Sequence, residues 1–98
     1  MSIYELNIKE FAKEVAGNTY GVEQEDTWNI YIEMGAATIS YDEDFNNLEL
    51  CSAKNKDTVI RIDADLIEDI DKGYENGKER YVIYFKDFMT NITLNKIL

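Results

Sequence analysis

The dipeptide Asn76-Gly77 constrains the fold of this chain more than any other short stretch of its sequence. A two-residue type I′ turn needs positive φ at both central residues, and Asn followed by Gly supplies it at the least cost. The run after it, Arg80 to Phe85, is rich in the β-branched and aromatic residues that are common in strands. We therefore predict that Ile67 to Glu75 pairs with Lys78 to Phe85, with Ile70 facing Ile83, Asp69 facing Tyr84 and Asp71 facing Val82.

The segment Asp63 to Lys72, which leads into that hairpin, has two interpretations. Asp63 can cap one or two helical turns that carry the apolar residues of the stretch Leu66 to Ile70. The Asn76-Gly77 turn instead requires an extended strand over most of the same segment. We favour a short turn at Asp63 to Leu66 followed by a strand, and the helix is the alternative.

A helix is predicted near the N-terminus, over residues 3 to 16. Ser2 can cap this helix, and Glu5, three residues later, completes a capping box. Gly17 can end it, because a residue with positive φ commonly follows a helix. The face that this helix buries in the core of a small domain is expected to consist of Tyr4, Ile8, Phe11 and Val15.

A second hairpin is predicted after a loop at residues 17 to 27. Trp28 to Met34 alternates apolar and polar residues, as a half-buried strand does. Gly35-Ala36 fits a type II′ turn, which has Gly first, so Ala37 to Tyr41 is predicted as the returning strand. In that register one face carries Met34 with Ala37, Ile32 with Ile39 and Ile30 with Tyr41.

Three more strands are predicted, at Leu48 to Ser52, Thr58 to Ile62 and Thr90 to Leu94, and in the first of them Leu48 and Leu50 are expected to point inward. Short turns between strands join antiparallel neighbours into a meander. Residues 1–98 are expected to form one domain, because a chain of this length has room for a single core. We predict an α+β fold in which the N-terminal helix packs on one face of a curved antiparallel β-sheet of roughly five to seven strands in meander order. A small, partly closed barrel is the nearest alternative.

The net charge of the chain, −10 at pH 7, restricts its partners. Bare nucleic acid and anionic membranes are poor partners, whereas a basic protein surface attracts an acidic protein and raises the association rate. The competing interpretation is that the acidity serves solubility alone. The sequence has no recognisable signal peptide and no apolar run of the roughly 18 residues that span a membrane. A single cysteine, Cys51, fits a reducing compartment, so we expect a cytoplasmic protein.

No motif in the sequence carries catalysis, and we predict no catalytic residue, no metal and no cofactor. Histidine is absent, so the usual general base and the commonest zinc ligand are missing. The acidic run from Asp63 suggests a calcium loop, but Ile67 and Glu68 occupy the positions that need an oxygen ligand and a glycine. Without a histidine to activate it, Cys51 is expected to be structural.

The remaining candidate for a functional site is a set of acidic residues interleaved with tyrosines. Closely spaced carboxylates can imitate a row of phosphates, which a basic nucleic-acid groove would accept, and Tyr adds contact area at low entropic cost. The alternative is that the acids form a solvated exterior while the tyrosines fill the sheet. The predicted partner-binding residues are Glu23, Glu25, Asp26, Asp42, Glu43, Asp44, Asp63, Asp65, Glu68, Asp69, Asp71, Tyr74 and Glu75.

In size, acidity and composition the whole chain resembles small proteins of phages and mobile elements of the anti-CRISPR type. The resemblance implies a non-enzymatic inhibitor that occludes the basic nucleic-acid-binding surface of a bacterial immune nuclease, such as a CRISPR effector, without binding nucleic acid itself. A host polymerase or a DNA-repair nuclease would suit the residues equally. The alternative function is that of a structural or assembly module of a phage or of a low-GC bacterium.

Overall fold

One helix packs against one antiparallel sheet in a computed structural model of the chain, which describes residues 4–5, 7–25, 31–55, 57–86 and 90–97. The predicted α+β class is therefore confirmed. The elements, in chain order, are β1 (Tyr4–Glu5), α1 (Ile8–Val15), β2 (Tyr20–Glu25), β3 (Tyr31–Asp42), β4 (Asn47–Ser52), β5 (Val59–Asp63), the 3-10 turn η1 (Ala64–Leu66), β6 (Ile67–Glu75), β7 (Lys78–Phe85) and β8 (Asn91–Lys96).

Within the described residues, the sheet has eight strands in the order β1-β6-β7-β8-β2-β3-β4-β5, and every pair of neighbours is antiparallel. Seven of them have five or more residues, within the predicted range of five to seven strands, and the eighth is the two-residue β1 at the edge. The predicted meander order is confirmed within β2 to β5 and within β6 to β8. The two runs are joined side by side by the pairing of β8 with β2.

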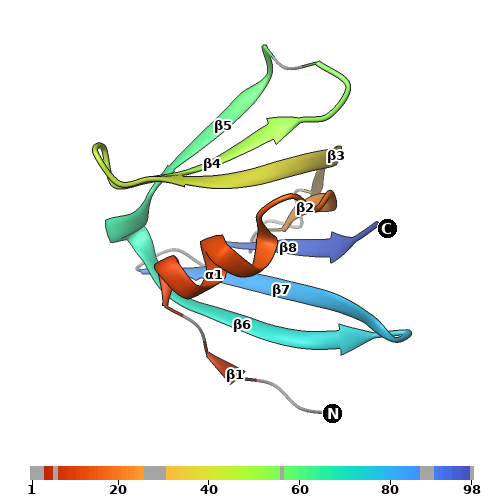
Figure 1. The fold of residues 1–98 in the computed structure, drawn as a ribbon. Coiled ribbons are helices and arrows are strands. Elements are labelled where there is room, and N and C mark those ends of the chain that lie inside the picture. Colours follow the sequence, from red (N-terminus) through yellow and green to blue (C-terminus); the bar gives the residue numbers. More distant parts are fainter. Residues whose placement is uncertain (1–3, 6, 26–30, 56, 87–89, 98) are drawn as a thin grey trace.

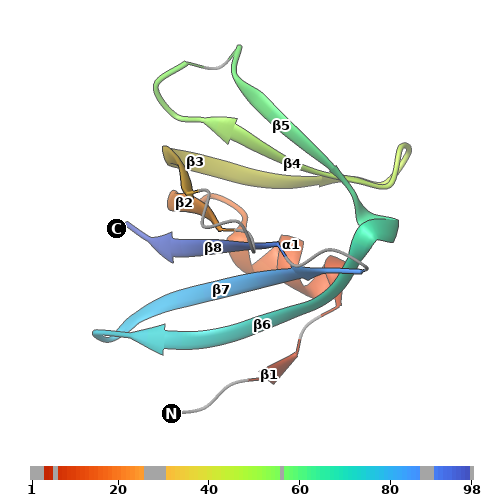
Figure 2. The same ribbon diagram turned by 180° about the vertical axis from the view of Figure 1, so that it is seen from behind.

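The sheet is strongly curved, with α1 on its inner side (Figure 1). The three residues of η1 lead from β5 directly into β6, although these strands lie near opposite ends of the sheet order. The two ends therefore approach each other at η1 and diverge away from it (Figure 2). No pairing between β5 and β6 is present among the described residues, so the sheet is open and the alternative of a barrel is not realised.

The helix begins later than the sequence predicted. Asn7 is its N-cap, and the Asn7 side chain accepts a hydrogen bond of 2.8 Å from the backbone N–H of Glu10 and donates one to the Glu10 carboxylate. The first bond satisfies a backbone N–H of the first helical turn, so α1 starts at Ile8, and Tyr4 and Glu5 belong to β1 instead. Ser2 lies outside the described residues. The predicted end is confirmed, because Gly17 has a φ of +77° directly after the helix.

The second predicted hairpin is wrong. Residues 20 to 25, expected in a loop, form β2, and β3 runs without interruption through Gly35-Ala36. Gly35 does have positive φ, +79°, but it lies at a bulge where the register against β2 shifts by one residue. A glycine with positive φ serves a bulge as well as a turn, and the local sequence does not distinguish the two.

The hairpin of β6 and β7 is confirmed in every predicted pair, including Ile70 with Ile83. Asn76 and Gly77 have φ values of +53° and +79°, as a type I′ turn requires. The short turn before β6 is also confirmed, with the Asp63 carboxylate accepting a hydrogen bond of 2.9 Å from the backbone N–H of Asp65. The β6–β7 register shifts between Ile67 and Asp69, so Glu68 lies in a bulge and Ile67 and Ile70 can both pack against the core.

The core fills the space between α1 and the inner face of the sheet. Phe11 of α1 is fully buried, and its ring meets the ring of Tyr81 on β7 edge to face, with centroids 5.3 Å apart. Tyr20 on β2 contacts the same Tyr81 ring at 5.8 Å. The predicted inward residues of β4 are confirmed, because Leu48 and Leu50 are both fully buried. The helix thus covers the inner face and leaves the outer face of the sheet to solvent.

Candidate functional site

Three of the predicted acidic residues of β6 lie on the outer face of the sheet. Ile70 and Lys72 point inward and are buried, so Asp69, Asp71 and Glu75 point outward by the alternation of a strand. Asp71 lies opposite Val82, Val82 opposite Thr93, and Thr93 opposite Glu23 in successive strands. Asp71 and Glu23, far apart in sequence, therefore belong to one row that crosses four strands, about 14 Å from end to end.

A second acidic group forms where the β3–β4 turn meets η1. The Asn46 side-chain amide donates a hydrogen bond of 3.0 Å to the Asp65 carboxylate, and the Ala64 backbone N–H donates one of 2.9 Å to the Asn46 carbonyl. These bonds hold two separate acidic segments together. We call this group the corner cluster, and it consists of Asp42, Glu43, Asp44, Asp63 and Asp65.

The remaining predicted residues fall elsewhere. Tyr74 belongs to the inner side, with its ring centroid 5.7 Å from the Lys72 ammonium, and so does not share the outer face with Asp69 and Asp71. Glu68 is exposed at the bulge of β6. Glu25 ends β2, but its side chain and the whole of Asp26 lie outside the described part of the chain. The structure therefore divides the predicted set into an outer-face row, the corner cluster and isolated positions.

Most of these carboxylates have no cation to balance them. Among the described residues, the ion pairs that involve surface acids are Lys9 with Glu43 at 3.7 Å, Arg61 with Glu49 at 3.3 Å and Arg80 with Glu75 at 3.4 Å. Within the same residues, no ion pair reaches Glu23, Asp42, Asp44, Asp63, Asp65, Glu68, Asp69 or Asp71. Both acidic groups therefore carry a surplus of negative charge.

A hollow of about 370 Å³ interrupts the outer face of the β6–β7 hairpin. Gly73 lies opposite Arg80 and has no side chain to fill the space between the neighbouring strand positions. Tyr84 on the same face is 38% exposed. The lining residues are Asp71, Gly73, Tyr74, Glu75, Arg80, Val82 and Tyr84.

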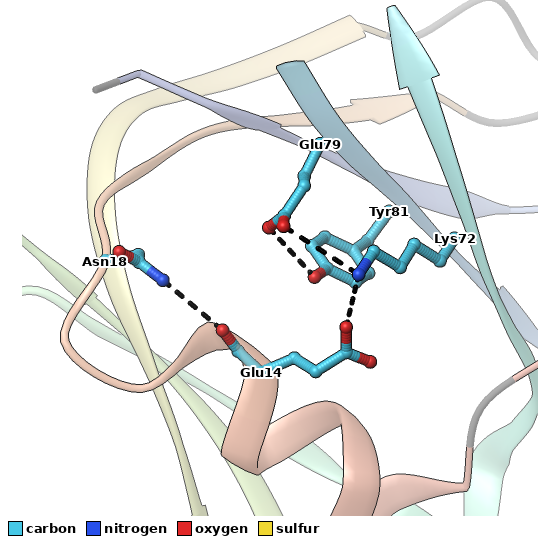
Figure 3. Close-up of polar contacts among 5 residues, drawn as sticks. All are labelled: Glu14, Asn18, Lys72, Glu79 and Tyr81. Carbon is cyan, nitrogen blue, oxygen red and sulfur yellow. Dashed lines mark hydrogen bonds and ion pairs between the residues drawn. The ribbon is translucent and has the colours of Figure 1, made fainter. Parts of the chain in front are cut away.

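The inner side carries a polar cluster that sequence reasoning missed (Figure 3). Lys72 is only 6% exposed, and its ammonium contacts the Glu14 carboxylate of α1 and lies 3.8 Å from Glu79 of β7. The Tyr81 hydroxyl donates a hydrogen bond of 3.2 Å to Glu79. The predicted register contained the signal, because Ile70 opposite Ile83 on the inner face puts Lys72 opposite Tyr81 on that same face.

The phenols of this cluster are held in the protonated state. Burial raises the pKa of Tyr81, with Tyr20, Glu79 and Glu14 adding to the effect and Lys72 opposing it. Burial also raises the pKa of Tyr20, and Glu79 adds to it. A phenol with a raised pKa donates hydrogen bonds and is a poor general base near neutral pH. The geometry of the cluster serves to attach the helix to the sheet.

The part of the chain that the structure describes contains no group of three or more His, Cys, Asp or Glu side chains placed to hold a metal ion. Cys51 is half-buried on β4, where its thiol lies 3.9 Å from the Ser52 carbonyl. None of the described helices has the length and apolarity to cross a membrane.

Comparison of the chain with protein-family models, with curated proteins and with solved structures finds no match. The distribution of charge over the fold is therefore the observation that bears on function.

Proposed function

We propose that this protein is a non-enzymatic binding protein whose acidic outer face occludes the basic, nucleic-acid-binding surface of another protein. One observation carries the proposal: Asp69, Asp71 and Glu23 project from the same face of the sheet, and within the described residues no cation pairs with any of them. The partner is a bacterial immune nuclease, and the protein is an inhibitor of the anti-CRISPR type that acts in the bacterial cytoplasm.

The spacing of the carboxylates supports mimicry of a phosphate backbone. Residues two apart on a strand lie about 6.7 Å apart, so Asp69 and Asp71 present charge at about half the linear density of one nucleic-acid strand. Glu23 extends the charge across the sheet. A basic groove that accepts these carboxylates releases counterions much as it does when it binds nucleic acid, so the complex should weaken as salt rises.

The test is affinity capture from a low-GC bacterial lysate that contains CRISPR effectors, at low and at high salt, with the bound proteins identified by mass spectrometry. We expect a basic nucleic-acid-binding protein that is retained at low salt and depleted at high salt. Asp71→Lys should reduce its recovery strongly. Asp57→Lys makes the same change in net charge at an exposed residue outside both acidic groups, and should reduce it little. Equal recovery with the two variants would contradict the proposal.

A second function, that of an assembly module, is favoured by apolar side chains at the corner cluster. Phe45 in the β3–β4 turn is 75% exposed, and Leu66 at the end of η1 is 43% exposed. Exposed large apolar side chains on neighbouring segments are typical of contacts between subunits. In this case high salt would not reduce the recovery of the captured partner, and that partner would have no nucleic-acid function. Phe45→Ser would abolish its capture, whereas Asp71→Lys would not.

A further inference from the structure

The hollow on the β6–β7 hairpin is built asymmetrically around two acids. Glu75, at the end of β6, forms an ion pair with Arg80, whose Nε is covered from solvent and lies 3.4 Å from the Glu75 carboxylate. Asp71, on the other side of Gly73, has no ion-pair partner among the described residues. The hollow thus has one neutralised acid and one acid that still lacks a cation.

The strand register places an aromatic wall beside Asp71. Asp71 lies directly opposite Val82, and Tyr84, two residues along β7, is its diagonal neighbour on the same face. Diagonal neighbours across an antiparallel pair lie about 7–8 Å apart, within reach of long side chains. A guest in the hollow would therefore meet a carboxylate, an aliphatic surface and an exposed phenol ring together.

The chemistry of this lining selects a guanidinium. A carboxylate accepts two parallel hydrogen bonds from a guanidinium, and the planar, weakly hydrated group also stacks on aromatic rings. An ammonium ion offers only a compact, strongly hydrated charge. An anion would meet the unbalanced charge of Asp71, and the cation that could attract it, Arg80, is already paired with Glu75.

We propose that the hollow receives an arginine side chain of the basic partner, with Asp71 as its carboxylate and Tyr84 as its stacking surface. This inference rests on the proposed function, because it names a specific contact through which the outer face binds a basic surface. A residue of the partner that inserts into a partly enclosed site beside an aromatic ring is the usual form of an interface hot spot. The outer-face row would then supply attraction, and the hollow would supply specificity for arginine.

The experiment uses the full chain and two small probes, Nα-acetyl-arginine methylamide and the corresponding lysine compound. Titration is followed through the backbone amide signals of a ¹⁵N-labelled sample. We expect the arginine probe to shift the amides of Gly73, Arg80 and Val82 saturably, with the lysine probe binding several-fold more weakly. Asp71→Asn should weaken the arginine probe about tenfold through loss of a charge-assisted contact. Asp57→Asn, an exposed control, should leave the titration unchanged.

Equal shifts with both probes, shifts centred on the corner cluster, or a titration unaffected by Asp71→Asn would overturn the inference. Asn is close in size to Asp and Asp71 makes no ion pair in the described residues, so the variant should fold normally. The two proposals fail separately. If the arginine probe causes no amide shifts but a basic partner is captured in a salt-sensitive way, only the arginine site is refuted. If the arginine probe binds at the hollow but no partner is captured, the proposed function is refuted.

Discussion

The buried ammonium of Lys72 on β6 contacts the carboxylate of Glu14 on α1, and this pair joins the helix to the sheet (Figure 3). The Lys72 side chain is 7% exposed and that of Glu14 is 31% exposed, so the cation is the deeper partner. Taking an ion out of water costs several kcal/mol unless opposite charges and hydrogen bonds compensate it. Glu14 and Glu79 supply that compensation from two different elements.

Removal of the carboxylates around Lys72 should destabilise the protein more than removal of the lysine. In Glu14→Gln/Glu79→Gln the ammonium loses both carboxylates described beside it, and we expect a loss of about 3–5 kcal/mol in the free energy of unfolding. In Lys72→Met the buried charge itself is gone, and the two half-exposed carboxylates can be hydrated, so the loss should be smaller. Urea unfolding of the wild type and the two variants measures these losses. A greater loss for Lys72→Met than for the double variant would show that Lys72 stabilises the fold through packing instead of charge.

Alkaline pH should destabilise the fold through Tyr81 and Tyr20. The pKa of each is raised in the folded state above the unfolded value of 10.0, so each binds its proton more tightly when folded. Their contribution to stability is full below pH 10 and is lost as pH rises above 10 toward the folded pKa. Denaturant unfolding from pH 8 to pH 11 should show a steeper loss in the wild type than in Tyr81→Phe. Tyr84→Phe, on the exposed outer face, should lose stability with pH as the wild type does. If the free energy of unfolding of Tyr81→Phe falls with pH as steeply as that of the wild type, the proposed role of the Tyr81 proton is refuted.

Alanine at Gly77 should weaken the β6–β7 hairpin. An alanine with the φ of +79° found there costs about 1–2 kcal/mol, because its Cβ approaches the backbone too closely. Gly21→Ala is the matched control, since a Cβ at Gly21 would meet only the Asn95 carbonyl at 3.9 Å, an ordinary contact. Thermal unfolding should show a lower midpoint for Gly77→Ala than for Gly21→Ala. Equal midpoints would mean that the turn changes to another type with no loss of stability.

The N-cap of α1 should be Asn7 in solution. Asn7→Ala removes the side-chain acceptor of the Glu10 N–H and should cost about 1 kcal/mol in the free energy of unfolding. Ser2→Ala, at the cap that the sequence pattern favoured, should change it much less because the helix starts at Ile8. Urea unfolding curves of the two variants decide between the caps. A greater loss in the free energy of unfolding for Ser2→Ala would show that Ser2 caps the helix, as the sequence pattern predicted.

The hairpin at Asn76-Gly77 was predictable to the residue because its determinants are local. The turn dipeptide fixes the loop length, and the loop length fixes the pairing from Glu75 with Lys78 as far as Asp69 with Tyr84, where the bulge at Glu68 begins. The same logic failed at Gly35, where positive φ belongs to a bulge in a long strand. Nothing within a few residues of Gly35 reveals that β2 will lie beside it.

The N-terminal segment shows a different limit. Tyr4, Ile8, Phe11 and Val15 share a helical period, but Tyr4 pairs with Lys72 as part of β1. Two capping patterns competed in the same ten residues, and the one at Asn7 and Glu10 is the one that the fold uses. Pairing with the exposed edge of β6 stabilises an extended conformation at residues 4 and 5, and that edge is created by residues more than sixty positions away.

The sequence by itself determined the α+β class, the β6–β7 register, the inward residues of β4 and the surplus of acidic over basic residues, because each depends on composition or on neighbours along the chain. Tertiary structure alone decided where the acids meet. Glu23 joins the row of Asp71 only through β7 and β8, and Asp42 lies in one row with Asp63 only because both pair with Asn47 of β4. The predicted register put Lys72 on the inner face, but the packing of α1 decided its burial between Glu14 and Glu79. The energy of a charge depends on which distant groups surround it, and those neighbours exist only once the sheet has curved around the helix.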